Sequence, residues 1–323
     1  MQTVTSPDLP HGVRQVEVGP ERDGQRIDNA LMTLLKGVPK SMIYRLLRTG
    51  QVRVNGKRAK PDTRLSQGDT LRIPPVRMAE RPPELGASQG AIAAAAEAVI
   101  FEDKHFLVID KPSGMASHGG SGVSHGAIEL LRQARPKEHL ELVHRLDRDT
   151  SGVLVFARTR AGLTGLQAAI RAGEVTKQYL CLMVGHPSKA RFDVNAPLQK
   201  SILQGGERMV RVSEGGKPSL TFFREMEQYP GARLMQATLG TGRTHQIRVH
   251  AAHIGHPLAG DTKYGDREAN KRFKDRGLNR LFLHASHMSF ELDGRSYGFS
   301  APLPEDLKSF LDALASPRGK SGR

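Results

Sequence analysis

The stretch Val-His-Arg-Leu-Asp-Arg-Asp-Thr-Ser-Gly occupies residues 143–152 and leads directly into the apolar run Val-Leu-Val-Phe-Ala at 153–157. Five consecutive apolar residues after a glycine predict a buried strand. Asp147 therefore lies at the mouth of that strand, between Arg145 and Arg148. The two cations favour its ionised form, in which a carboxylate acts as a nucleophile or a base but not as a general acid. The positive charge on both sides indicates that the molecule brought to Asp147 is anionic.

Asp147 also has a structural interpretation, as a turn or cap residue ahead of Thr-Ser-Gly, although Asp149 fits that role better. A glycoside hydrolase would need a second carboxylate with a raised pKa on the far side of the sugar. Asp149 does not supply it, because it lies among the same arginines. The segment therefore favours a single carboxylate that acts alone.

The chain is strongly basic, with 48 Lys and Arg against 33 Asp and Glu and a net charge of +15. A generally basic proteome is one explanation, but a polyanionic partner, most often nucleic acid, is the more economical one. Residues 36–77 carry eleven Lys or Arg against two acids, a net +9 (11 − 2). A solvated surface explains two or three such charges, not nine in excess. Tyr44 is the one aromatic residue there, which favours recognition of folded RNA through backbone and shape over base stacking.

A small basic domain precedes a larger one. Apolar residues at helical spacing predict helices at 27–35 and 42–50, and alternation around an Asn-Gly turn predicts a hairpin at 52–58. Paired prolines then mark a linker, in which 91–98 fits a short helix and a disordered segment equally well. The predicted parts are a flexible tail at 1–19, the basic domain at 20–76, the linker at 77–98, the main domain at 99–315 and a flexible basic tail at 316–323.

In the main domain, strands outnumber helices and no regular strand–helix–strand repeat is present. We therefore predict an α+β fold with a mixed, mainly antiparallel β-sheet rather than a Rossmann fold or a barrel. Strands are predicted at 99–101, 106–109, 153–157, 178–184, 210–212, 220–223 and 234–239, and helices at 127–131 and 163–172.

Two further segments have residue types suited to a site. Residues 240–250 form a basic run that begins with two glycines, and its Arg243 and Arg248 suit phosphate contacts or pairing with a buried carboxylate. Tyr179, in the Lys-Gln-Tyr segment at 177–179, enters an apolar strand. A tyrosine in that position is more often part of the core, unless it faces Asp147.

Several classes of site are disfavoured by composition. The single cysteine, Cys181, excludes an intramolecular disulfide and a cysteine-based zinc site, and it is expected to be buried. The histidines at 245, 250, 253 and 256 lack an HExxH pattern and a nearby acid cluster, so contacts with backbone or substrate are favoured over a metal site. There is no signal-peptide pattern and no apolar run of about 18 residues. We therefore expect a cytoplasmic protein that does not enter membranes.

Three ordered segments together resemble the signature motifs of the RluA-type pseudouridine synthases. They are His-Arg-Leu-Asp at 144–147 with Thr-Ser-Gly at 150–152, Lys-Gln-Tyr at 177–179, and Gly-Arg-Thr-His-Gln-Ile-Arg-Val-His at 242–250. The basic domain is similar to the alpha-L, or S4-type, RNA-binding domain of a small-subunit ribosomal protein, and the resemblance covers about residues 20–315. Segments at 37–45, 73–77, 203–212 and 277–284 are similar to family members that modify large-subunit ribosomal RNA at several sites.

The resemblance implies a central RNA-binding cleft and the isomerisation of specific uridines in large-subunit (23S) ribosomal RNA to pseudouridine by base flipping. It implies that Asp147 is the catalytic aspartate, which attacks the sugar carbon, attacks the base or abstracts a sugar proton. Arg145 would extrude the uridine and take its place in the stack, Tyr179 would contact the flipped base, Ile247 would pack on it, and Arg248 would pair with Asp147.

The remaining expectations concern partners. The resemblance implies no cofactor, no ATP and no metal, because the isomerisation involves no net redox change, and we expect a monomer. Two other functions stay open, a non-catalytic RNA-binding or ribosome-assembly factor and a synthase of the same family that acts on transfer RNA. Contacts of the basic domain with RNA are expected at Lys40, Arg45, Arg48, Arg53, Lys57 and Arg58.

Overall fold

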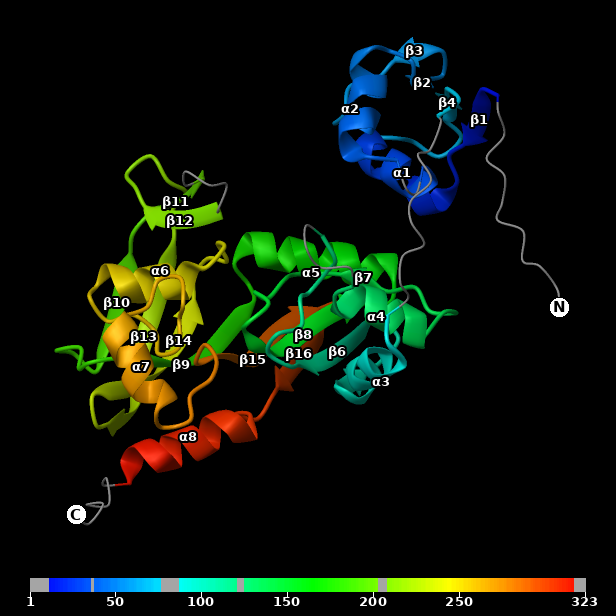
Figure 1. Cartoon of the computed structure of the whole chain (residues 1–323). Helices are drawn as coiled ribbons and strands as arrows, with labels where there is room; N and C mark the ends of the chain where they lie inside the picture. The colour runs from blue at the N-terminus through cyan, green and yellow to red at the C-terminus, as the bar shows by residue number, and fades with distance from the viewer. Residues whose placement is uncertain (1–11, 36–37, 77–86, 121–124, 203–207, 317–323) are drawn as a thin grey trace. The chain divides into compact units, whose positions relative to one another are not determined.

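A computed structural model of the chain describes residues 12–35, 38–76, 87–120, 125–202 and 208–316. The chain folds into two compact units, Met1–Leu85 and Gly86–Arg323, whose elements Figure 1 labels in chain order. Much of the predicted tails and of the linker lies outside the described residues, as do residues 203–207 of one segment used for the family resemblance.

The N-terminal unit is built on a four-stranded sheet with the order β1-β4-β2-β3. The predicted hairpin is present, and Asn55 (φ 48°) and Gly56 (φ 76°) adopt the left-handed conformation that its two-residue turn requires. Both predicted helices are also present, and they bury Ile27, Leu31 and Ile43 against the sheet. The elements are β1 (Arg14–Glu17), a 3-10 turn (Pro20–Arg22), α1 (Ile27–Leu34), α2 (Lys40–Arg48), β2 (Arg53–Val54), β3 (Lys57–Arg58) and β4 (Thr70–Ile73).

The C-terminal unit is an α+β domain around a ten-stranded sheet. Eight of the strands follow the order β10-β13-β14-β9-β15-β8-β6-β5, and the other two, β16 and β7, pair with β15 and β8. Among the described strand pairs, β8 with β15 is the parallel one and the others are antiparallel, so the predicted mixed sheet is confirmed. The strands are β5 (Val99–Glu102), β6 (Phe106–Lys111), β7 (Glu141–Leu142), β8 (Ser151–Ala157), β9 (Thr176–Val184), β10 (Arg191–Asn195), β13 (Leu220–Tyr229), β14 (Ala232–Leu239), β15 (Leu283–Leu292) and β16 (Arg295–Ser300), with a separate hairpin of β11 (Leu198–Ile202) and β12 (Arg208–Val212).

The helices of this unit correct one predicted boundary. Helix α3 lies inside the predicted linker 77–98, packs against α4 and buries Ala95 in the core. The large unit therefore begins before residue 99. The alanine-rich run at 91–98 forms a helix because α4 packs against it. The helices are α3 (Gln89–Glu97), α4 (Ala127–Ala134), α5 (Arg160–Ala172), α6 (Gln246–His253), α7 (Arg267–Lys274) and α8 (Glu305–Ala315). None of the helices in the described residues combines the length and apolar character of a membrane span.

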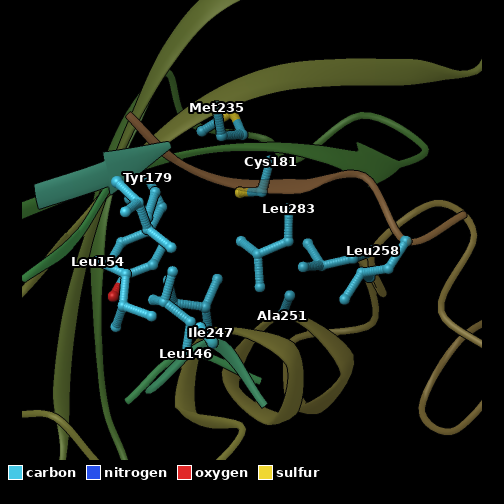
Figure 2. Close-up of a cluster of buried hydrophobic side chains, with 14 of the residues drawn as sticks. Leu146, Leu154, Tyr179, Cys181, Met235, Ile247, Ala251, Leu258 and Leu283 are labelled. Atoms are coloured by element: carbon cyan, nitrogen blue, oxygen red, sulfur yellow. The ribbon is translucent and has the colours of Figure 1, made fainter. Parts of the chain in front are cut away.

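The core brings the three motif segments together at the middle of the sheet. Figure 2 shows Leu146, which precedes β8, beside Tyr179 of β9, Ile247 of α6 and Leu283 of β15 in one apolar cluster. Cys181 of the same cluster is fully buried, as predicted. Leu146 and Ile247, which are 101 positions apart in sequence (247 − 146), therefore pack in the same cluster. Their sequence neighbours Asp147 and Arg248 meet at its edge.

The close approach of β8 and β15 depends on a glycine. Gly152 adopts φ 109° and pairs with Ala285. A Cβ atom at this position would collide with the carbonyl oxygen of Ala285. The glycine of the Thr-Ser-Gly motif thus lets the strand that follows Asp147 lie against β15.

Candidate active site

Asp147 lies in a turn between β7 and β8 whose backbone is held on both sides. Thr150 N donates to the carbonyl of Asp147 at 3.2 Å. The Ser117 hydroxyl donates to Leu146 O at 2.7 Å and accepts from Leu146 N at 2.9 Å, and Gly114 N donates to Arg148 O at 2.9 Å. The backbone around Asp147 is therefore fixed, while its side chain remains 28% exposed.

Lys111, at the end of β6, holds the same turn from behind. Its side chain is fully buried, and Nζ donates to the carbonyl oxygens of Pro112 (2.9 Å), Met115 (2.7 Å) and Arg148 (3.1 Å). Burial lowers the pKa of Lys111 to about 7, whereas the three carbonyl acceptors favour the ammonium form. Lys111 thus joins the 112–115 turn to the segment that carries Asp147.

We expect Lys111→Met to lower the free energy of unfolding by about 3 kcal/mol, because Pro112 O and Met115 O lose their buried partner. Urea unfolding measures this difference. Lys104→Met, at an exposed lysine between β5 and β6, is the control and should change the value by less than about 0.5 kcal/mol. Equal effects of the two substitutions would contradict the role of Lys111.

The side-chain nitrogens that face Asp147 come from the start of α6 rather than from its sequence neighbours. Arg248 Nη1 lies 3.4 Å and His245 Nε2 lies 3.7 Å from Asp147 Oδ2. The expected contact between Arg248 and Asp147 is thus present. The neighbours point elsewhere, because Arg145 Nη1 contacts His118 Nε2 at 3.2 Å and Arg148 Nε donates to Asp149 at 3.1 Å. Arg145 and Arg148 therefore make these contacts with other side chains, although both line the wide cleft that Asp147 also lines.

Arg248 is itself held by Asp261, a residue that the sequence patterns did not single out. Arg248 Nε and Nη2 donate to the two Asp261 oxygens at 2.7 and 2.9 Å, and the Asp261 side chain is 0% exposed. Lys263 N and Tyr264 N also donate to Asp261, at 2.9 and 3.0 Å. Burial opposes both charges, but the paired hydrogen bonds outweigh it, so the pKa of Arg248 is raised and that of Asp261 is lowered.

Asp147 opens into a small cavity of about 70 Å³. The cavity is also lined by Tyr179, Ile247, Arg248 and Arg145, so the structure brings together the five residues expected at the site. Tyr179 is 9% exposed and Ile247 5% exposed, and they form an apolar wall continuous with the core in Figure 2. Burial, together with the charge of Asp147, raises the pKa of Tyr179, so its phenol stays protonated at neutral pH.

A wider cleft of about 1120 Å³ adjoins the small cavity and shares Arg145, Asp147 and Tyr179 with it. Its lining includes one acid, Asp147, and several bases contributed by α5, β9 and the loop after β14. Such a lining attracts a polyanion and leads it to the carboxylate. The basic side chains of the cleft are Arg145, Arg148, Arg171, Lys177 and Arg243.

Two histidines of α6 and the loop after it contact backbone or hydroxyl oxygens. His250 lies between Thr221 Oγ1 and Ala196 O, both at 2.9 Å, and His256 Nδ1 lies 3.0 Å from Val184 O. Within the part of the chain that the structure describes, no three His, Cys, Asp or Glu side chains are grouped as metal ligands.

Comparison with known proteins gives a match in each of the two units. Residues 105–253 match the family model described as RNA pseudouridylate synthase, and residues 25–71 match the S4 domain. Ribosomal large subunit pseudouridine synthase C of Escherichia coli (strain K12) is 51% identical over 95% of this chain and 98% of its own length. The chain belongs to the RNA pseudouridylate synthase family. Proteins with the same name from Yersinia pestis and Haemophilus influenzae are 50% and 48% identical over 94% of the chain and over 96% and 95% of their own lengths.

Solved structures of the same family align with about two thirds of this chain. Human RNA Pseudouridylate Synthase Domain Containing 1 aligns with a TM-score of 0.58 and 26% identity over 68% of this chain and 87% of its own. Human RNA Pseudouridylate Synthase Domain Containing 4 aligns with a TM-score of 0.58 and 25% identity over 70% and 97%. The α+β prediction therefore agrees with the synthase fold.

Proposed function

We propose that this protein isomerises specific uridines of large-subunit ribosomal RNA to pseudouridine, with Asp147 as the catalytic aspartate. The observation that carries the proposal is a single carboxylate in a small cavity that adjoins a basic cleft. The relatives named ribosomal large subunit pseudouridine synthase C, at 51% identity over 95% of the chain, support this RNA as the substrate.

The geometry suits a uridine that has left the base stack. A base that is stacked in a folded RNA reaches a carboxylate set inside a small cavity only after it flips out, which costs a few kcal/mol. Tyr179 and Ile247 offer the apolar surface on which the flipped base packs. Arg145 lies at the rim of both cavities, and its planar guanidinium can stack and hydrogen-bond in the vacancy.

Asp147 acts on the nucleotide in its ionised form. Arg248 lies 3.4 Å from the Asp147 carboxylate and is itself fixed by Asp261. The charge of Arg248 therefore stabilises the carboxylate and leaves it accessible to the nucleotide. The carboxylate then serves as nucleophile or base while the N1–C1′ bond breaks and the C5–C1′ bond forms. The reaction involves no net oxidation or reduction of the nucleotide, so we propose that the enzyme needs no redox cofactor. We further infer that it acts as a monomer in the cytoplasm.

Pseudouridine mapping tests the proposal directly. Unmodified large-subunit ribosomal RNA and a pool of unmodified transfer RNA are each incubated with the purified protein. We expect pseudouridine at specific positions of the ribosomal RNA and none in the transfer RNA. Modification of transfer RNA alone would refute the substrate, and tight binding of ribosomal RNA without modification would favour an assembly factor.

The small domain is proposed to anchor the RNA through its exposed basic side chains. These lysines and arginines lie on α2, away from its apolar face, and along the hairpin. Its proposed contacts are Lys40, Arg45, Arg48, Arg53, Lys57 and Arg58. Replacing Lys40, Arg45 and Arg48 by glutamine should lower the slope of log affinity against log salt by about 2, since each lost phosphate contact removes about 0.7 to 0.9. Filter binding across salt concentrations measures the slope.

The control for this prediction removes the same charge from the other unit. Lys271, Arg272 and Lys274 are exposed on α7, and their replacement by glutamine should leave the slope unchanged. If both triple variants lower the slope equally, the effect reflects net charge and not contacts of the small domain.

A further inference from the structure

Tyr44, on helix α2 of the small domain, is an aromatic side chain that the core of this domain does not use. It is 42% exposed, and it is not part of the cluster that α1 and α2 pack against the sheet. Within the described part of the small domain, Val13 and Tyr44 are the large apolar or aromatic residues left this exposed. A single exposed apolar residue is common on protein surfaces, so the surroundings of the Tyr44 ring decide what it is for.

The Tyr44 hydroxyl is tied to a buried carboxylate of α1. It donates to Asp28 Oδ2 at 3.1 Å, and Asp28 is 3% exposed. Arg26 donates to both oxygens of Asp28, from Nε at 3.1 Å and from Nη2 at 2.7 Å. The hydrogen bond from Arg26 keeps the pKa of Asp28 below its usual value, so Asp28 stays an acceptor for the phenol. The ring is therefore held in place at the surface, and a ligand that contacts it immobilises little further.

Positive side chains border the ring. Helix α2 carries three bases and no acid. Lys40, Tyr44 and Arg48 are exposed and follow one another at intervals of four residues, so they lie on one face of the helix. The Arg26 side chain, which shares Asp28 with Tyr44, is 45% exposed. Asp62 is an exposed acid whose charge reaches Arg26, so cations outnumber acids around the ring by three to one.

A flat aromatic surface between cations matches one nucleotide with its phosphates. Base stacking on an aromatic ring requires a base whose face is free, and such bases occur in loops, bulges and single strands. A fully paired helix covers the faces of its bases, so it would use the cations and leave the ring idle. One aromatic side chain accommodates one base, which agrees with a domain that otherwise recognises the backbone and shape of folded RNA.

We propose that Tyr44 stacks on an unpaired base of the bound RNA, while Lys40, Arg48 and Arg26 contact the phosphates on either side of that base. The inference rests on the proposed function and deepens it. The small domain then selects a place in the ribosomal RNA where a base is free, in addition to attracting RNA by its charge.

Two substitutions in the full-length protein separate the ring from the hydroxyl. Tyr44→Leu keeps an apolar side chain but removes the ring, and Tyr44→Phe keeps the ring but removes the hydroxyl. We expect Tyr44→Leu to weaken filter binding of unmodified large-subunit ribosomal RNA by about 5- to 100-fold, the usual contribution of stacking on one base. The slope of log affinity against log salt should not change, because no phosphate contact is lost. Tyr44→Phe should retain most of the affinity.

Fluorescence reports the stacking itself. The chain contains no tryptophan, so Tyr44→Trp introduces a single indole at the proposed contact. We expect its emission to be quenched by large-subunit ribosomal RNA and not by a fully paired RNA duplex. Phe222→Trp is the matched control, because Phe222 is a 47% exposed aromatic residue on β13 of the other unit. Its emission should be the same with and without either RNA.

Three results would overturn the proposal. They are a Tyr44→Leu variant that binds ribosomal RNA as tightly as the wild type, an indole at position 44 that ribosomal RNA does not quench, and equal quenching by ribosomal RNA and by the duplex. The proposed function fails in a different way, through a wild-type protein that forms no pseudouridine. Binding and quenching are measured without the reaction, so the two failures are distinguishable.

Discussion

Asp147→Asn is expected to reduce pseudouridine formation by about 10⁴-fold or more, the scale of losses seen when an essential catalytic side chain is removed. Asparagine has the same shape but is neutral, so it serves neither as nucleophile nor as base. Binding of RNA should persist, because the cations of the wide cleft are untouched. Quantitative pseudouridine mapping under single-turnover conditions, together with filter binding, measures the two effects separately.

Asp149→Asn is the matched control for this substitution. Asp149 lies two residues away in the same turn, and its side chain is 43% exposed and pairs with Arg148 at the surface. An exposed pair of this kind contributes little, so the activity of this variant should remain within a few-fold of the wild type. Comparable losses in both variants would mean that charge in the turn, and not a specific carboxylate, supports the reaction.

The sequence predicted the fold where hydrophobic periodicity is strong. The continuous apolar run at 153–157 became β8, and the Asn-Gly turn at 55–56 formed the hairpin. The strand β15 was missed because His284, Ser286 and His287 interrupt its apolar pattern. Segment 283–292 forms a strand because β8, β9 and β16 pair with its backbone, and these pairings cannot be predicted from its own sequence.

Only those residues of the site that belong to the sequence motifs could be predicted. The motif residues Asp147, Tyr179, Ile247 and Arg248 meet in one cavity, as the family resemblance implied. Asp261 was not predictable, since it belongs to no recognised pattern and becomes important through a contact with Arg248 across 13 residues. The direction of Arg145 and Arg148 was likewise hidden, because adjacent side chains in a turn point apart.

Asp261→Asn is expected to lower the free energy of unfolding by about 3–5 kcal/mol, because it leaves the buried guanidinium of Arg248 without its main partner. The rate of pseudouridine formation should also fall by about 10²-fold, the scale associated with misplacing a catalytic group by about 1 Å. Arg248, released from Asp261, would move toward the Asp147 carboxylate and pair with it tightly. Urea unfolding and single-turnover rates measure the two effects, and Asp275→Asn, at an exposed residue after α7, is the control.

The pH dependence separates the charge of Asp261 from its shape. Because the folded protein lowers the pKa of Asp261, the stability that this group contributes is fully present above the ordinary carboxyl pKa of about 3.9. It is lost as the pH falls through the lower pKa of the folded state, since the unfolded chain then binds the proton first. The difference in unfolding free energy between the wild type and Asp261→Asn should therefore be largest at neutral pH and shrink below about pH 4. A difference that stays constant from neutral to acidic pH would show that the asparagine disturbs packing, and that the ion pair with Arg248 is not what holds the site together.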